Sequence, residues 1–357
     1  MNENNRAFTD QEIDAFVTAQ KKGHFMQSPR WGKVKSEWKS RVLVSTGEDG
    51  AIRGTLHVLM RKTPVFGYSL MYAPRGPVCD IHDGAVIADL VGQAKALCKK
   101  ERCYELKIDP DVPISDTDFS SLMKKLGFRI DTSLTGFAGA QPHFVFRLNI
   151  KGRTEDDIMM GFEKQTRKNV RRAVKYGITT RIGTREDIPI LYEMVEETSR
   201  RQGFAHRPID YFYRMYDAFA PEYLRLYIME FEGEVCCASF VMNYGNKVWS
   251  VYSGTSDHHR EKKATFLMRM EQIRWGLERG CEIYDLMGVP GKVPEDHPLY
   301  GLYAVKKGFG GELTEFGGEM DLIVHPFIYF LAENGEKFIR FARRTIKTAG
   351  RKKKAEK

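Results

Sequence analysis

The sequence lacks the marks of several common protein classes. It contains no phosphate-binding loop, no dinucleotide fingerprint and no nucleophile elbow, so none of these motifs points to an activity. It has no run of about 18 apolar residues and no apolar segment behind its polar first residues, so we expect neither a membrane span nor a signal peptide. Its six cysteines form no Cys-x-x-Cys pair: Cys79, Cys98, Cys103, Cys236, Cys237 and Cys281. We therefore predict reduced, buried thiols in a cytoplasmic protein, without a disulfide framework or a metal site.

The residues that are present are typical of a folded protein with two domains. Apolar residues make up 42% of the chain and aromatic residues 12%, values that exclude a disordered protein. A length of 357 residues exceeds one ordinary hydrophobic core. The net charge of +9 is uneven, because residues 337–357 hold ten Lys or Arg and a single acidic residue. This excess predicts a polyanionic partner: nucleic acid, anionic lipid or a nucleotide-bearing substrate.

One order of expected elements occurs twice along the chain. The first copy has strands at 42–44, 55–60 and 68–71, a helix at 84–100 and a strand at 103–110. The second copy has strands at 224–231, 236–243 and 247–252, a helix at 264–279 and a strand at 281–288. Self-similarity over so many residues predicts two copies of one unit rather than a solenoid. The order resembles that of GNAT acyltransferases, so we expect an α/β fold with mixed sheets in tandem GNAT-like domains. We place residues 1–147 plus 318–357 in the first domain and residues 148–317 in the second.

A strongly basic helix is expected between the two copies, from Glu155 to about Tyr176. Thr154 is a good cap for its start, acidic residues fill its first turn, and Gly177 ends it. Six cations recur on one face at steps of three and four residues: Lys164, Arg167, Lys168, Arg171, Arg172 and Lys175. Either this face is simply solvated, or it binds a polyanion that relieves the repulsion among these charges.

The loop before the second copy's helix argues against coenzyme A. GNAT enzymes hold the pyrophosphate of that cofactor with a glycine-containing loop at this position. Here the loop reads Arg260-Glu-Lys-Lys-Ala-Thr265, without glycine, so backbone amides cannot approach a pyrophosphate as closely. We therefore expect no coenzyme A and no other cofactor.

Segments spread in order over nearly the whole chain carry a more specific resemblance. They are 25–35 (Phe-Met-Gln-Ser-Pro-x-Trp-x-Lys-Val-Lys), 73–78, 108–110, 141–142, 206–212, 244–247, 284–288, 299–309 and 318–321. In these segments the chain resembles the Fem family (FemABX), the aminoacyltransferases that build the interpeptide bridges of peptidoglycan. It is similar to the shorter members, because the region from Thr198 to Pro221 shows no sustained heptads of a coiled-coil insertion.

The resemblance implies a reaction and two substrates. An amino acid is moved from aminoacyl-tRNA, the co-substrate, to the side-chain amine of the third residue of a peptidoglycan stem peptide. The acceptor is UDP-MurNAc-pentapeptide or lipid II, and we expect a monomer that works in the cytoplasm or at the inner face of the membrane. Two alternatives remain: a GNAT-fold acyltransferase with another donor, such as acyl coenzyme A, and a non-catalytic protein that binds tRNA or lipid.

Four residues match the family positions that hold the diphosphate and sugar of the precursor. They are Lys35, Arg207, Tyr211 and Tyr252. Lys and Arg form charge-assisted hydrogen bonds to phosphate, and Tyr hydroxyls add directional donors. Taken singly, Arg207 could cap a turn and Tyr252 could be a core aromatic residue, but the matching set favours precursor binding.

Three further residues are expected, by the same resemblance, to take part in aminolysis of the activated ester. Lys306 would stabilise the carbonyl oxyanion or orient the terminal ribose of the tRNA. Asp109 and Glu319 would position or deprotonate the acceptor amine, although an activated ester needs only modest help from a base. Val305 departs from the family, which often has Phe there, and we expect this change to alter the packing of the tRNA's terminal adenosine. The neighbouring Lys307 is expected to be solvated.

The basic C-terminal stretch leaves three interpretations open. Residues 326–347 are amphipathic, with Phe327, Phe330 and Phe341 among their apolar side chains. Such a segment suits contact with tRNA phosphates. It equally suits an interfacial helix on anionic lipid. In the third interpretation, its first half packs onto the first domain.

Overall fold

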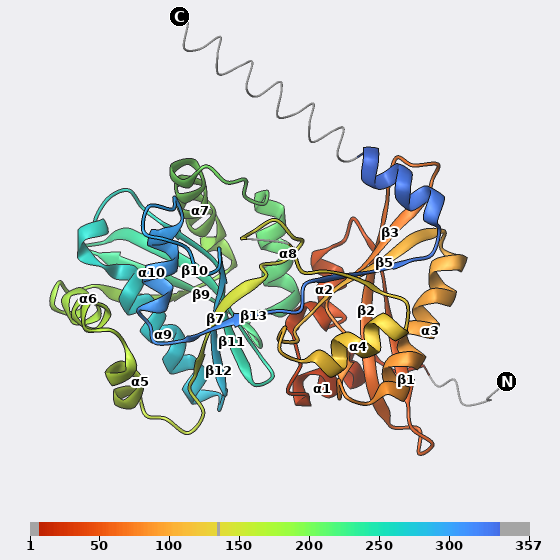
Figure 1. The fold of residues 1–357 in the computed structure, drawn as a ribbon. Helices are drawn as coiled ribbons and strands as arrows, with labels where there is room; N and C mark the ends of the chain where they lie inside the picture. The colour runs from red at the N-terminus through yellow and green to blue at the C-terminus, as the bar shows by residue number, and fades with distance from the viewer. Residues whose placement is uncertain (1–6, 134–135, 336–357) are drawn as a thin grey trace, which may run out of the picture.

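A computed structural model describes residues 7–133 and 136–335, which form two α/β units side by side (Figure 1). The first sheet has the order β1-β2-β3-β5-β14-β6, with β4 beside β2. Its strands are β1 (Lys39–Thr46), β2 (Ile52–Lys62), β3 (Ser69–Arg75), β4 (Val78–Cys79), β5 (Cys103–Pro110), β6 (Arg129–Asp131) and β14 (Glu319–Ile323). The second sheet has the order β13-β7-β12-β11-β10-β9-β8. Its strands are β7 (Phe144–Asn149), β8 (Thr179–Gly183), β9 (Leu224–Phe231), β10 (Glu234–Tyr244), β11 (Lys247–Thr255), β12 (Ile283–Val289) and β13 (Glu312–Glu315).

The two sheets are built in the same way. In the first, β1, β2 and β3 pair antiparallel and β3 pairs parallel with β5. In the second, β9, β10 and β11 pair antiparallel and β11 pairs parallel with β12. A helix makes each parallel crossover: α3 (Gly84–Lys100) and α9 (Ala264–Glu278). The predicted repeat and the predicted mixed α/β fold are therefore confirmed.

Local sequence signals explain where several helices begin. Thr9 and Glu12 form a capping box at the start of α1 (Asp10–Ala19), as predicted. Asp83 accepts hydrogen bonds from the first free amides of α3. Further helices are α2 (Arg30–Val34), α4 (Thr117–Lys125), α7 (Ile188–Gln202), α8 (Ile209–Phe219) and α10 (Tyr300–Lys307). Three short 3-10 turns are η1 (Phe25–Gln27), η2 (Arg185–Asp187) and η3 (Arg260–Lys262).

The expected boundary at residue 147 falls inside a strand and needs correction. β7 pairs antiparallel with β12 and with β13, so the whole strand belongs to the second sheet. β14 returns to the first sheet, where it lies between β5 and β6. The first unit therefore ends before Phe144 and resumes near Gly318. The sequence could not place this boundary, because strand partners are chosen by contacts between distant segments.

The single basic helix expected from Glu155 to Tyr176 is also a correction. The chain forms α5 (Glu155–Gly161) and then α6 (Lys164–Lys175), with an extended backbone at Phe162 between them. The ring of Phe162 is buried and lies edge-on to Phe309, with 5.0 Å between ring centres. Burial of this large aromatic side chain in the second core outweighs the continuity of the helix.

The hydrophobic core has a large cluster that belongs to both units. Phe25 and Trp31 of the first unit pack with Phe219 and Trp249 of the second. Figure 1 shows α2 and α8 meeting at this junction, and they are in contact. Two further clusters lie within the first and the second unit. All six cysteines are buried and free, as predicted.

The tail packs onto the first unit as far as the structure describes it. Residues 326–335 are helical, and Ile328 and Ala332 are buried against Tyr104. The rest of the amphipathic stretch and the basic end lie outside the described residues. Among the helices of the described part, none combines the length and the apolar character needed to cross a membrane.

Candidate active site

Asp109 lies near the end of β5, where its carboxylate is buried and hydrogen-bonded. The Tyr72 hydroxyl donates to Oδ2 at 2.6 Å, and the Arg75 backbone N–H donates to Oδ1 at 2.8 Å. Burial raises the pKa of Asp109 to about 6, although Arg75 and these hydrogen bonds oppose the shift. The group can therefore exchange a proton near neutral pH, which suits an acid or a base.

Glu319, the first residue of β14, lies in the same small pocket as Asp109. Gln141, Pro142 and Phe316 also line this pocket. The Ala140 N–H donates to Glu319 Oε1 at 2.5 Å, and Lys107 Nζ donates to Oε2 at 3.1 Å. The structure thus brings together the two carboxylates predicted to handle the amine, although 210 positions separate them in the sequence (319 minus 109).

Lys306 is buried on α10, whereas Lys307 is exposed, as predicted for Lys307. The Lys306 ammonium donates a hydrogen bond of 2.8 Å to the Gly288 carbonyl at the end of β12. Burial lowers the pKa of Lys306 to about 7; Arg269 acts in the same direction and Asp285 opposes it. While it is protonated, a lysine desolvated in this way acts more strongly on nearby charges than an exposed lysine does. It also loses its proton more readily.

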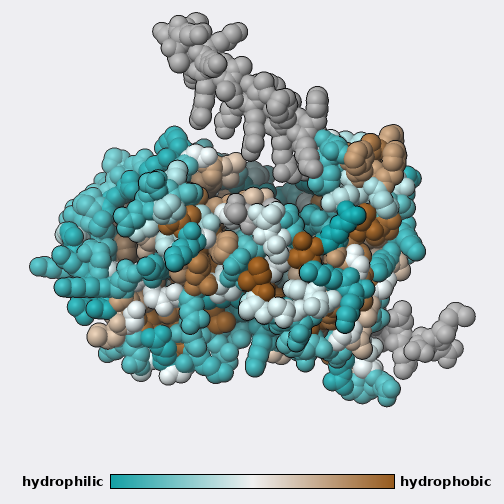
Figure 2. All heavy atoms as spheres, viewed as in Figure 1, coloured by the Kyte–Doolittle hydropathy of each residue, from teal (hydrophilic) through white to brown (hydrophobic). Residues whose placement is uncertain are grey.

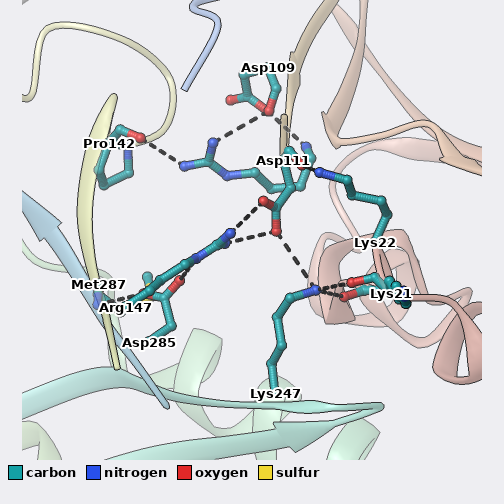
Figure 3. A network of polar contacts seen from close by, with 11 residues as sticks. Lys21, Lys22, Asp109, Asp111, Pro142, Arg147, Lys247, Asp285 and Met287 are labelled. Carbon is teal, nitrogen blue, oxygen red and sulfur yellow. Dashed lines mark hydrogen bonds and ion pairs between the residues drawn. The ribbon is translucent and has the colours of Figure 1, made fainter. Parts of the chain in front are cut away.

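A network of buried charges joins these parts across the two units (Figure 3). Asp111, just beyond β5, accepts two hydrogen bonds from Arg147 of β7, at 2.7 and 2.8 Å. The same guanidinium donates to Asp285 of β12 at 2.9 Å. Lys247 of β11 has its Nζ 3.9 Å from Asp111 and 2.7 Å from the Lys21 carbonyl. Burial acts to raise the pKa of Asp111, but Arg147 and Lys247 hold it well below its usual value.

The residues predicted from the sequence to be functional do not include Asp111, Arg147, Lys247 or Asp285. The signal that could have found them is a charged side chain within or beside an apolar strand. A buried charge in such a position is favourable only with an oppositely charged partner. Nothing in the sequence alone shows which carboxylate each cation meets, so the network appears only in the folded chain.

The four predicted precursor-binding residues also come together. The Lys35 ammonium lies over the Tyr211 ring at 4.9 Å, and the Arg207 guanidinium lies over the same ring at 5.5 Å. The Tyr252 hydroxyl is 3.4 Å from that of Tyr211. Burial lowers the pKa of Lys35 to about 8, and Arg207 adds to the shift. Two neighbouring cations with hydroxyl groups beside them form a cluster that suits an anion such as a diphosphate.

The six predicted cations of the basic helix are not equivalent. Arg167 donates to the Met160 carbonyl at 3.0 Å, and Arg172 donates to the Tyr176 hydroxyl at 2.9 Å. The other four are exposed: Lys164, Lys168, Arg171 and Lys175. The start of α6 lies next to the end of α10, because the Glu163 N–H donates to the Gly308 carbonyl at 2.9 Å. The basic helix is therefore adjacent to the helix that carries Lys306.

Comparisons with known proteins show the family of this chain. The model of the FemAB family matches residues 8–232 and 227–337. The chain belongs to the FemAB family. The lipid II:glycine glycyltransferase of Staphylococcus epidermidis RP62A is 27% identical over 393 aligned positions, covering 91% of this chain and 94% of that protein. The enzyme of the same name from Staphylococcus aureus is 26% identical over 397 positions, with the same coverage. Both alignments are longer than 357 residues, so these relatives hold segments that this shorter FemAB chain lacks.

Solved structures agree with the family assignment. The crystal structure of FemX superposes with a TM-score of 0.86 at 26% identity, over 91% of this chain and 98% of that one. A tandem GNAT protein from the clavulanic acid pathway superposes with a TM-score of 0.52 at 13% identity, covering 88% of this chain and 96% of that one; this likeness concerns the fold alone. Among the described residues of this FemAB chain, no group of three or more His, Cys, Asp or Glu is arranged to hold a metal ion.

Proposed function

We propose that this protein is an aminoacyltransferase that moves an amino acid from aminoacyl-tRNA to the side-chain amine of a peptidoglycan precursor. The observation that carries the proposal is the Lys306 ammonium, buried on the Gly288 carbonyl in a chain of the FemAB family. The similar staphylococcal proteins are named for transfer of glycine to lipid II. Lipid II is therefore the first acceptor to test, and UDP-MurNAc-pentapeptide is the second.

The reaction is an aminolysis. The acceptor amine attacks the ester carbonyl, a C–N bond forms, and the C–O bond to the tRNA ribose breaks. The amine proton passes to a carboxylate, Asp109 or Glu319, and a proton ends on the released ribose oxygen. The Lys306 ammonium stabilises the negative charge that develops on the ester oxygens. This scheme uses no cofactor. The loop before α9, which lacks the glycines that hold coenzyme A in GNAT enzymes, folds as η3 followed by Lys263.

The acceptor diphosphate binds at Lys35, Arg207, Tyr211 and Tyr252, and the tRNA acceptor arm binds along α6. The position of α6 next to α10 supports the second assignment, because an arm held there delivers its charged end toward Lys306. The aminoacyl group itself is recognised only in part by the protein, since the tRNA already carries it.

The enzyme also contacts the inner face of the membrane through an aromatic corner of the first unit. Phe66, Phe327 and Phe330 are 70%, 70% and 62% exposed, which is unusual for large apolar side chains. The Tyr68 ring lies 5.1 Å from that of His325, so the loop of Phe66 adjoins residues 326–335. Figure 2 shows apolar atoms gathered at the upper right, where Figure 1 places this helix. The basic residues that follow it in the sequence favour anionic lipid.

Substitution Lys306→Ala should reduce transfer by about 100-fold to 1,000-fold, because the charge aimed at the developing oxyanion is removed. Labelled aminoacyl-tRNA is offered with each acceptor separately, and product is counted for wild type, Lys306→Ala and Lys307→Ala. The exposed neighbour Lys307 is the matched control and should keep the wild-type rate. Transfer of label from acyl coenzyme A, and not from tRNA, would show that acyl coenzyme A is the donor. No transfer from folded, tRNA-binding wild type would leave a non-catalytic binding protein.

Substitution Arg207→Ala should raise the KM for the acceptor about 10-fold to 100-fold, since a hydrogen bond to a charged group contributes about 1.5–3 kcal/mol. The KM for aminoacyl-tRNA should not change. Arg185→Ala is the control, because its guanidinium also lies over a tyrosine of α8, Tyr213, at 4.6 Å. Equal KM values for the two variants would argue against the precursor site.

Replacing the four exposed cations of α6 with Ala should weaken tRNA binding and flatten its salt dependence. Affinity falls as salt rises, and each phosphate that the protein no longer neutralises reduces the steepness of log affinity against log salt by about 0.7–0.9. Filter binding between low and moderate salt measures the slope, and a quadruple variant at exposed cations of the first unit (Arg53, Lys99, Lys124 and Lys125) is the control. The same slope in both variants would remove α6 from the tRNA site.

The double variant Phe327→Ser/Phe330→Ser should bind vesicles that contain anionic phosphatidylglycerol about 10-fold less than wild type, because its corner no longer inserts apolar side chains. Co-sedimentation measures binding, and Met160→Ser, another exposed apolar residue, is the control. Transfer to the water-soluble UDP-linked acceptor should be unaffected. Unchanged vesicle binding would refute the membrane contact.

A further inference from the structure

Arg147 is the cation that links the two halves of the site. It lies on β7, and its three donor nitrogens are all used: Nη1 and Nη2 bind Asp111, and Nε binds Asp285. Asp111 and Asp285 are both about 2% exposed, so water does not substitute for these contacts. A planar, permanently charged fork between two carboxylates from different units holds both at a defined distance and angle.

On one side, the contact leads to Lys306. Asp285 pairs with Arg147 across the sheet, but the register shifts before Gly288 pairs with Val145. The Met287 N–H donates to Asp285 Oδ1 at 2.7 Å, and Met287 has a φ of 62°, which is rare for this residue type. This bulge directs the Gly288 carbonyl toward the Lys306 ammonium. The side chain that shapes the bulge is thus the one that Arg147 holds.

On the other side, the contact leads to Asp109. Asp111 follows Asp109 by two residues on the same strand end. The guanidinium groups of Arg147 and Arg75 both lie over the Phe316 ring, at 4.9 Å and 4.3 Å from its centre. The backbone N–H of Arg75 in turn donates to Asp109 at 2.8 Å. Figure 3 shows Arg147 and Asp111 between the strand end that bears Asp109 and the turn that bears Met287.

We propose that Arg147 is a positioning residue that holds the Gly288 turn under Lys306 in register with the Asp109 carboxylate. The inference rests on the proposed function for what Lys306 does in the reaction. Arg147 itself touches neither substrate in this scheme. It acts by keeping Asp285 turned into the bulge, where the carboxylate accepts the Met287 N–H.

Loss of this cation changes the charge that faces Lys306. Besides burial, Arg269 on α9 lowers the pKa of the ammonium and Asp285 on β12 raises it. With Arg147 removed, the Asp285 carboxylate is no longer neutralised, and its effect on Lys306 grows. The pKa of Lys306 should then rise above its value of about 7. This shift reports the loss of the cation beside Asp285, and the accompanying fall in kcat reports the loss of positioning.

The test compares Arg147→Met with a matched control, Arg181→Met. Arg181 on β8 has the same pattern of hydrogen bonds to two carboxylates, with two bonds to Asp187 and one from Nε to Glu230. The Lys306 ε-carbon is followed by NMR in protein with ¹³C-labelled lysine, and its signal is assigned with Lys306→Met. We expect the titration to move to higher pH and kcat to fall about 100-fold in Arg147→Met, with KM values unchanged. Arg181→Met should change neither.

Two further variants keep the inference falsifiable. Arg147→Lys retains the charge without the fork, so the titration should return toward wild type while kcat recovers only in part. Asp285→Asn should shift the Lys306 titration in the opposite direction, to lower pH, even if Arg147→Met fails to fold. A Lys306 titration that is the same in Arg147→Met and in Arg181→Met overturns the inference. A wild type that transfers nothing overturns the proposed function instead. The Lys306 titration still tests the effect of Arg147 in that case, because it does not depend on transfer.

Discussion

The ion pair between Asp111 and Arg147 is the contact on which the rest of the site depends. Both groups are withdrawn from water, and such a pair is favourable only when every donor and acceptor is matched. The third donor of Arg147 meets that condition through Asp285, and Lys247 completes the surroundings of Asp111. Removing one partner of a buried pair typically costs about 3–5 kcal/mol. The relative placement of the two sheets is therefore strongly constrained at this point.

The two copies of the unit contribute different chemistry at this junction. The first copy supplies carboxylates at the end of β5 and the start of β14. The second supplies the Lys306 ammonium, placed by a bulge in β12. The large shared core behind them, where Phe25 packs against Trp249, allows neither unit to move freely. In the proposed reaction the acceptor amine meets the first copy's groups, and the ester of the tRNA meets those of the second.

Much of this could be read from the sequence, because the signals were local or repeated. The capping box at Thr9 follows from a short stretch of chain, and the two units follow from the repeated order of strands and helices. The choice of Lys306 over Lys307 came from resemblance to the Fem family. Grouping Lys35 with Arg207 and Tyr252 came from resemblance to the Fem family rather than from any physical signal between them. The break at Phe162 was missed, because helix periodicity continues through it and only the core packing reveals the turn.

The sequence alone determined the two α/β units, the basic segment at residues 155–176 and the side chains capable of acid–base chemistry. These properties depend on composition, on periodicity and on which residues are neighbours in the chain. Only the tertiary structure decided that β7 completes the second sheet, that Glu319 joins Asp109, and that Arg147 spans two carboxylates. The physical reason is that a buried charge is stabilised by whichever partner the fold brings within hydrogen-bonding distance, and such partners lie far apart in the chain.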